Sequence, residues 1–290
     1  MRKRKKSSVF DEERRAAWRF LAPSLTGIVV LVLAPFAETL RRSFYNNPGT
    51  AFVGLKNYQS VLQNDAFRLA AENTAKFLGV CVPALLAVSL ILALLVRAAP
   101  RGRKVFRTTF LLPMAIPVAS VCLLWKVLFA EKGLVNGILV SLGANAVDFM
   151  GTDASFWVLI FTYIWKNAGY HMILWLAGMD GISRSIYEAA EMDGANAWQQ
   201  LVHITLPGLA PTLTMVSVLS LLNGFKVFRE AYLVAGSYPH DSIYLMQHLF
   251  NNWFRNLDLG RLTAGAVLMA AVLLGLIVCM ARLGERGREA

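Results

Sequence analysis

Long apolar runs constrain this chain more than any other feature of its sequence. Segments of about 20 mostly apolar residues are long enough to cross the hydrocarbon core of a bilayer as helices. The composition agrees, because 56% of the residues are hydrophobic and the mean hydropathy is +0.50, above the usual range of soluble domains. We therefore predict an all-α polytopic membrane protein with six transmembrane helices. The predicted spans are residues 20–40, 73–96, 105–129, 156–176, 207–225 and 262–282.

Basic residues beside these runs predict the orientation of the chain. The net charge is +11, and much of the excess lies next to the spans, as expected where Lys and Arg mark cytoplasmic segments. This distribution explains the charge without nucleic-acid binding. We predict a cytoplasmic basic tail over residues 1–19 and one membrane domain over 20–290, with both termini and the loop 177–206 in the cytoplasm.

Two prolines fall inside the third predicted span. Pro113 and Pro117 each remove a hydrogen bond from the helical ladder, so the sequence predicts a kink within residues 105–129. Proline is tolerated there because neighbouring helices or a cavity can satisfy the freed carbonyl groups.

The polar loop 177–206, which we call the coupling loop, carries helix-capping patterns. Ser185 and Glu188 have the spacing of a capping box, which predicts a helix beginning near Ile186 and ending at Asp193–Gly194. Asn196 and Gln199 have a similar spacing, which predicts a second short helix towards Ile204 before Pro207 opens the next span.

The side chains of the coupling loop suit contact with another surface. Small residues at 189, 190 and 194 permit close approach, while Glu188 and Glu191 offer charge to a basic partner. Apolar residues at 186, 187, 198, 201 and 202 would anchor the loop to its own bundle or to a partner. The alternative is an amphipathic helix that lies on the lipid headgroups.

Polar residues inside the spans are the candidates for a transport path. An uncompensated charge in the membrane costs about 2.5 to 3.5 kcal/mol even on insertion scales, so Lys166 should face a cavity or a partner. The alternative for Lys126 and Lys166 is that they extend towards the interface or pair with a neighbouring helix. The other candidates are Asn167, Ser217, Ser220 and Asn223.

Motifs for catalysis or metal binding are absent from the sequence. It contains no G-x-x-x-x-G-K-[ST] phosphate loop, no H-E-x-x-H and no G-x-S-x-G. Cys81, Cys122 and Cys279 lie in apolar runs without a second ligand at metal-binding spacing, so neither a disulfide nor a zinc site is expected. We therefore expect no enzymatic activity, no cofactor and no metal in this chain.

The coupling loop resembles a known motif. Glu-Ala-Ala at 188–190, Gly194, and Ile204, Leu206 and Pro207 have the spacing of the EAA motif in permease subunits of binding-protein-dependent ABC importers. The chain is also similar to the first permease subunit of the carbohydrate, maltose-type branch. That similarity rests on Gly54–Tyr58, Trp165–Gly169, Leu176–Gly178 and Phe225–Phe228.

The resemblance implies a role for each part of the loop. It implies the type I importer fold, also called MetI-like, with a core over about residues 70–282. Glu188, Ala189, Ala190 and Gly194 would dock on an ATPase subunit, and Ile204, Leu206 and Pro207 would seat the loop on the fifth span. ATP and magnesium would be bound by the ATPase subunits.

The resemblance also implies partners and a location. The chain would work with a second homologous permease, two ATPase subunits and an extracytoplasmic solute-binding protein, in the bilayer of a bacterial cell membrane. The predicted function is the permease of an ATP-driven importer for a sugar or sugar-like solute. The alternative is an ion-coupled secondary transporter, which leaves the EAA motif unexplained.

Overall fold

The computed structural model describes residues 3–99 and 102–289. Apart from one isolated antiparallel bridge between Tyr45 and Phe52, the regular structure of this part of the chain is helical. The chain divides into two compact units, which we describe separately. The first unit extends to Gln63 and includes Trp253–Ala270, and the second comprises Asn64–Asn252 and the chain from Ala271.

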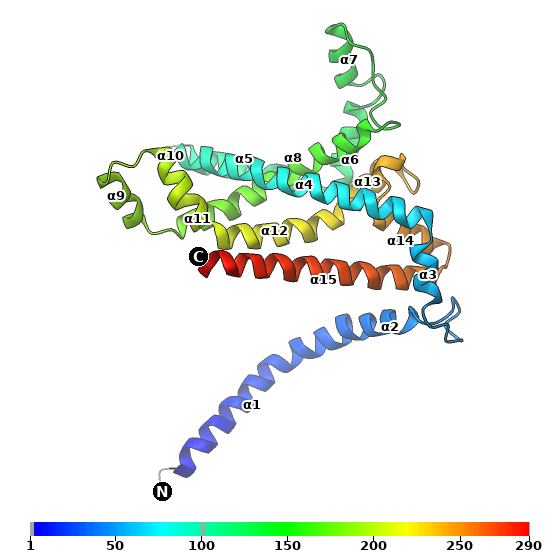
Figure 1. Cartoon of the computed structure of the whole chain (residues 1–290), viewed down its shortest axis with the longest axis horizontal. Coiled ribbons are helices and arrows are strands. Elements are labelled where there is room, and N and C mark those ends of the chain that lie inside the picture. The colour runs from blue at the N-terminus through cyan, green and yellow to red at the C-terminus, as the bar shows by residue number, and fades with distance from the viewer. Residues whose placement is uncertain (1–2, 100–101, 290) are drawn as a thin grey trace. The chain divides into compact units, whose positions relative to one another are not determined.

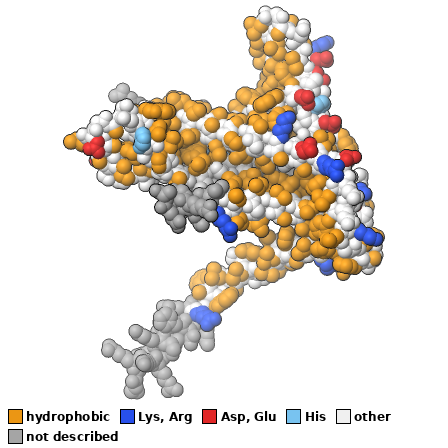
Figure 2. Space-filling model, in the orientation of Figure 1, with side chains coloured by type: hydrophobic (Ala, Val, Ile, Leu, Met, Phe, Trp, Pro, Cys, Tyr) orange, Lys and Arg blue, Asp and Glu red, His pale blue; other side chains and the backbone are white. Residues whose placement is uncertain are grey.

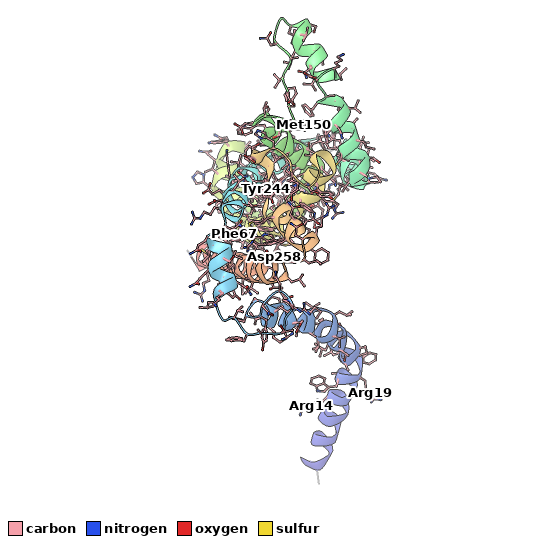
Figure 3. All side chains as sticks on the ribbon, turned by 90° about the vertical axis from the view of Figure 1, so that its right-hand side faces the viewer. Arg14, Arg19, Phe67, Met150, Tyr244 and Asp258 are labelled. Atoms are coloured by element: carbon pink, nitrogen blue, oxygen red, sulfur yellow. The ribbon has the colours of Figure 1, made fainter. Side chains whose placement is uncertain are left out.

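The first unit begins with the predicted first span. Helix α1, Lys3–Ile28, continues through a π-helical turn at Val29–Leu33 into α2, Ala34–Arg42. Figure 3 labels Arg14 and Arg19 on α1. The stretch Ala17–Arg42 is long and apolar enough to cross a membrane, yet none of its most apolar window is buried within the protein. Such a surface suits lipid or another subunit better than water.

A polar turn joins this helix to the rest of the first unit. The side chain of Asn46 accepts hydrogen bonds from the amides of Thr50 and Ala51, which closes the turn. Helix α3, Lys56–Leu62, follows. Asn47 and Ser60 bind the first turn of α15, Leu259–Glu289, through the Gly260 amide and the Arg261 guanidinium, both at 2.8 Å.

The second unit is built around two long helices, α4 (Asp65–Ala98) and α8 (Ala154–Asp180). Asn64 caps α4 by accepting a hydrogen bond from the amide of Phe67. Helix α12, Ala210–Gly224, packs on both α4 and α8, as Figure 1 shows. Two clusters of buried apolar side chains, one including Phe77 and the other Trp175, hold these helices together.

The third predicted span is broken rather than only kinked. Helices α5, Arg103–Ala115, and α6, Val118–Leu128, meet at an angle of 89°. Ile116 between them is extended, which is the conformation that a following proline favours. Pro117 caps α6, whereas Pro113 stays inside α5. The prediction of a proline distortion is confirmed.

Shorter helices complete the second unit. Before α8 lies α7, Leu134–Ser141. The coupling loop contains α9, Arg184–Met192, α10, Ala197–Gln200, a π-helical turn at Leu201–Thr205 and α11, Leu206–Gly208. After α12 come a 3-10 turn at Phe225–Val227, α13 at Phe228–Ala235, a second 3-10 turn at Asp241–Ile243 and α14 at Met246–Arg255.

Four helical stretches of the described chain are long and apolar enough to cross a membrane: Ala17–Arg42, Asp65–Ala98, Ala210–Tyr232 and Leu259–Arg282. If the bent pair α5 and α6 counts as one span, the number of candidate spans is five. Helix α8 has 27 residues, about 40 Å at 1.5 Å per residue, but Lys166, Asn167 and His171 lower its hydropathy. The count of six spans stays a prediction. Figure 2 shows apolar side chains over much of the visible surface.

Candidate functional site

The first helix of the coupling loop, α9, begins two residues earlier than predicted. Its N-cap is Ser183, which makes no side-chain capping bond, and Ser185 lies inside the helix. The hydroxyls of Ser183 and Ser185 instead lie 2.8 Å apart. The predicted capping box of Ser185 and Glu188 is therefore wrong. Glu188 pairs with Arg184, one turn earlier on the same exposed face, at 3.0 Å.

Gly194 ends α9, as predicted. Its φ of +82° lies in the left-handed region that side chains with a Cβ adopt at a cost. The Gly194 amide donates to the Glu191 carbonyl at 3.0 Å, and the Ala195 amide donates to the Ala190 carbonyl at 2.9 Å. These two bonds are those of a Schellman motif, which fixes the direction of the chain after the helix.

The second predicted helix is confirmed, together with its cap. The Asn196 side chain accepts from the Gln199 amide at 2.9 Å, and the Gln199 side chain accepts from the Asn196 amide at 2.8 Å. From this cap the chain stays helical through the π turn at Leu201–Thr205 and α11. Pro207 therefore lies within a helical connection that runs from the cap towards α12.

A small polar and aromatic cluster ties α9 to the rest of the second unit. The Tyr187 hydroxyl lies 2.9 Å from the Thr205 hydroxyl, and the Arg97 guanidinium lies 4.9 Å from the centre of the Tyr187 ring. Tyr187 therefore anchors the loop to its own bundle, as one of the two predicted alternatives has it. Ile186 and Trp198 do not, because their side chains are 49% and 70% exposed.

The proposed coupling residues form a mostly exposed set. Ala190 and Ile204 are partly buried. Tyr187 thus holds one side of the loop against the second unit, and the exposed side is available for contact with another surface. The exposed members of the set are Glu188, Ala189, Gly194, Leu206 and Pro207.

A cleft of about 400 Å³ lies at the break between α5 and α6. Lys166 and Asn167 of α8 and Asn223 of α12 line it, so the structure brings together three of the five residues proposed for the solute path. Ser217 and Ser220 are not among its lining residues. Both are buried, and the Ser220 hydroxyl donates to the Val216 carbonyl of its own helix at 2.7 Å.

Lys166 forms a buried ion pair across this cleft wall. Its Nζ lies 3.0 Å from Oε1 of Glu230 on α13, and each residue is 8% exposed. Lys166 therefore both lines a cavity and pairs with a neighbouring helix, which were considered as separate possibilities. Lys126, in contrast, is exposed on α6 and is not a lining residue.

Sequence reasoning missed Glu230. The polar segment 226–261 reads as an external loop with some helix, whereas the structure places its first helical residues in the cleft wall. The available signal was an acidic residue between the apolar pairs Val227–Phe228 and Ala231–Tyr232, which is the pattern of a partly buried helix.

A family model described as "Binding-protein-dependent transport system inner membrane component" matches residues 85–286, well over half of the chain. The chain belongs to this family. It is a multi-pass inner-membrane permease, the membrane subunit of a binding-protein-dependent ABC importer, and is not itself the catalytic subunit. The matched region contains the coupling loop and every residue that lines the cleft.

The permease is similar to curated relatives along most of its length. It is 29% identical to the trehalose/maltose transport system permease protein MalF of Thermococcus litoralis, over 96% of each chain. It is 31% identical to the lactose transport system permease protein LacF of Rhizobium radiobacter, over 82% of this chain and 83% of that one.

Solved structures support the fold of the permease. A crystal structure of a bacterial ABC transporter involved in the import of the acidic polysaccharide alginate superposes with a TM-score of 0.85. The match has 23% sequence identity and covers 96% of this chain and 99% of that chain. The importer permease fold predicted from the EAA resemblance is therefore confirmed.

Proposed function

We propose that this permease forms half of the translocation pathway of an ATP-driven importer for a sugar or sugar-like solute. Similar permeases serve transport systems for trehalose and maltose, for lactose and for arabinooligosaccharides. The observation that carries the proposal is the coupling loop. Its residue spacing matches that of the EAA motif, and one face of it is exposed while Tyr187 on the other face bonds to Thr205.

The coupling loop transmits movement because its central turn and its connection to α12 are both held in a defined geometry. The Schellman motif at Gly194 and the capping box at Asn196 hold α9 and α10 at a fixed angle. The helical connection through Ile204, Leu206 and Pro207 carries displacement of α9 to α12. An ATPase subunit that binds Glu188, Ala189, Ala190 and Gly194 would therefore move the helix that carries Asn223.

The other parts of the importer follow from this assignment. A second homologous permease supplies the other half of the pathway, two ATPase subunits bind ATP and magnesium, and an extracytoplasmic protein delivers the solute. The permease lies in a bacterial inner membrane with six spans and both termini in the cytoplasm. Residues 1–19 form the tail, and about 70–282 form the type I core.

The cleft is the proposed solute contact of this subunit. Lys166, Asn167 and Asn223 offer hydrogen-bonding groups next to the tyrosines Tyr163 and Tyr170. Polar groups beside aromatic surface are what a polyhydroxylated solute needs for orientation and contact area. Ser217 and Ser220 serve this pathway only indirectly, because they lie within the packed part of α12.

Cross-linking to the ATPase subunit tests the proposal. We expect the Ala189→Cys variant, purified as the whole complex in mild detergent, to form a cross-link with a co-purifying ATPase subunit. Ser141→Cys on α7 is the control, since Ser141 is also exposed but lies outside the coupling loop. Recovery of the permease without an ATPase, or equal cross-linking at both positions, would contradict the proposal.

A further inference from the structure

The charges that line the cleft are strongly unbalanced. Lys166, Lys226 and Arg229 face it, and among its lining residues Glu230 is the one acidic side chain. Glu230 is already matched by Lys166 at 3.0 Å. Lys226 and Arg229 are exposed and form no ion pair with the described residues. The cleft therefore keeps a net charge of +2.

The partial charges at the helix ends do not cancel this net positive charge. The N-terminus of α6, at Pro117 and Val118, lines the cleft without a side-chain cap, and this end of a helix is positive. The C-terminus of α5, at Met114 and Ala115, lines it too, and that end is negative. Because the two ends roughly offset each other, the side chains decide the sign of the potential.

Unmatched cations at such a place need an explanation. Lys226 and Arg229 are exposed near the end of the apolar stretch Ala210–Tyr232, and ionisable residues that line a cavity of a membrane protein mark candidate functional contacts. A neutral sugar is bound well by amide and tyrosine side chains, which this cleft already has in Asn167, Asn223 and Tyr170. Two further cations add little for a neutral solute, whereas an anionic group would compensate them.

We infer that the solute of this permease is an anionic carbohydrate, a sugar that carries a carboxylate, sulfonate or phosphate group. The sugar hydroxyls contact the amide and tyrosine side chains of the cleft. The anionic group lies beside Lys226 and Arg229, which are three residues apart in sequence across the junction of the 3-10 turn and α13. The inference rests on the proposed function and names the substrate class of the same cleft.

Charged thiol reagents measure the potential of the cleft without knowledge of the solute. Asn223→Cys is placed in a Cys279→Ser background, because Cys279 is exposed while Cys81 and Cys122 are buried. The whole transporter in nanodiscs is treated with an anionic and a cationic methanethiosulfonate of similar size, and rates are normalised to free cysteine. We expect the anionic reagent to react about 10-fold faster than the cationic one.

Variants that lack the two positive charges test whether Lys226 and Arg229 cause the faster reaction of the anionic reagent. Combining Lys226→Gln with Arg229→Gln should bring the ratio of the two rates close to one. Lys132→Gln is the matched control, since Lys132 is an exposed lysine between α6 and α7 that does not line the cleft. The control should keep the preference. A ratio near one before any charge is removed would overturn the inference, because a partner subunit would then neutralise the cations.

Uptake by proteoliposomes that contain the whole transporter, its binding protein and internal ATP gives the second readout. The probes are maltose and lactose as neutral sugars, and digalacturonate and sulfoquinovose as anionic ones. We expect uptake of an anionic probe and a loss of about 10-fold or more in the double variant. Uptake of neutral probes alone would overturn the inference. If the probes enter equally well without ATP, the importer proposal fails, and the reagent rates alone decide the charge of the cleft.

Discussion

At the scale of residues, the Lys166–Glu230 pair is the least replaceable contact of the cleft. Both side chains are about 10% exposed, so each charge depends on the other for compensation. Removing one member of such a pair is costly because the other charge stays buried and unmatched, whereas removing both leaves no charge behind.

This pair gives a stability prediction. Glu230→Gln should destabilise the permease by about 3 to 5 kcal/mol, and adding Lys166→Met should restore much of the loss. Thermal unfolding of the purified complex in detergent, run as a double-mutant cycle, measures the coupling. Losses that simply add would show that the pair does not act as a unit.

Gly194 gives a second prediction at this scale. A Cβ built there meets no atom within 4 Å, so the cost of a side chain comes from the positive φ alone, about 1 to 2 kcal/mol. Gly194→Val should therefore loosen the loop and lower solute-stimulated ATPase activity. Gly194→Asn, which tolerates this conformation, is the control and should keep most of it. Equal losses in both variants would place the cause at the partner surface instead.

His248 gives a prediction about pH. Its ring contacts those of Phe228 and Tyr244, the latter labelled in Figure 3, and its Nδ1 accepts from the Leu245 amide at 3.1 Å. Burial lowers the pKa of His248 from 6.5 to about 4. The neutral ring is favoured in the fold, so stability is full above pH 6.5 and falls towards pH 4, by about 2 to 3 kcal/mol.

The measurement compares melting temperatures at pH 7.5 and 5. His248→Asn keeps a hydrogen-bond acceptor near the position of Nδ1 but cannot take up a proton. We expect the difference between the two pH values to be smaller in this variant than in the parent. The same drop in both proteins would assign the pH dependence to other groups.

At the scale of elements, the close approach of α5 to α8 depends on Gly169. A Cβ at Gly169 would lie 1.8 Å from the Phe110 carbonyl oxygen, which is backbone and cannot rotate away. Gly169→Ala should separate the two helices and lower the melting temperature by several degrees. Gly79→Ala in α4 is the control, because a Cβ there meets nothing within 4 Å. Equal melting temperatures for the two variants would contradict this packing.

Sequence patterns predicted the local features of these elements well. The Asn196 cap, the stop at Gly194 and the proline distortion of the third span depend on a few neighbouring residues, and all three are present. The pattern at Ser185 failed because Ser183, two residues earlier, could also start the helix, and the chain begins the helix after Ser183.

Features that depend on packing between segments far apart in the sequence could not be predicted from local sequence patterns. The rotation of α12 directs Asn223 into the cleft and leaves Ser217 and Ser220 buried against other helices. The partner of Lys166 is 64 residues away, in a segment whose polarity indicates a loop. Which helix face meets which neighbour depends on the whole bundle, and the sequence of one helix does not contain that information.

At the scale of the whole molecule, the proposed function requires an energy source outside the chain. The sequence has no phosphate-binding loop, and the coupling loop presents an exposed face backed by Tyr187 and Thr205. The family match places the permease in importers that depend on a binding protein. In the proposed function, the energy for movement of α12 enters through the coupling loop.

Uptake by proteoliposomes tests this central claim most directly. The complete complex, with its binding protein outside and ATP or a non-hydrolysable analogue inside, is supplied with labelled solute in the presence and absence of an ion uncoupler. We expect uptake that requires hydrolysable ATP and is unchanged by the uncoupler. Uptake that persists without ATP and collapses when the ion gradient is dissipated would contradict it.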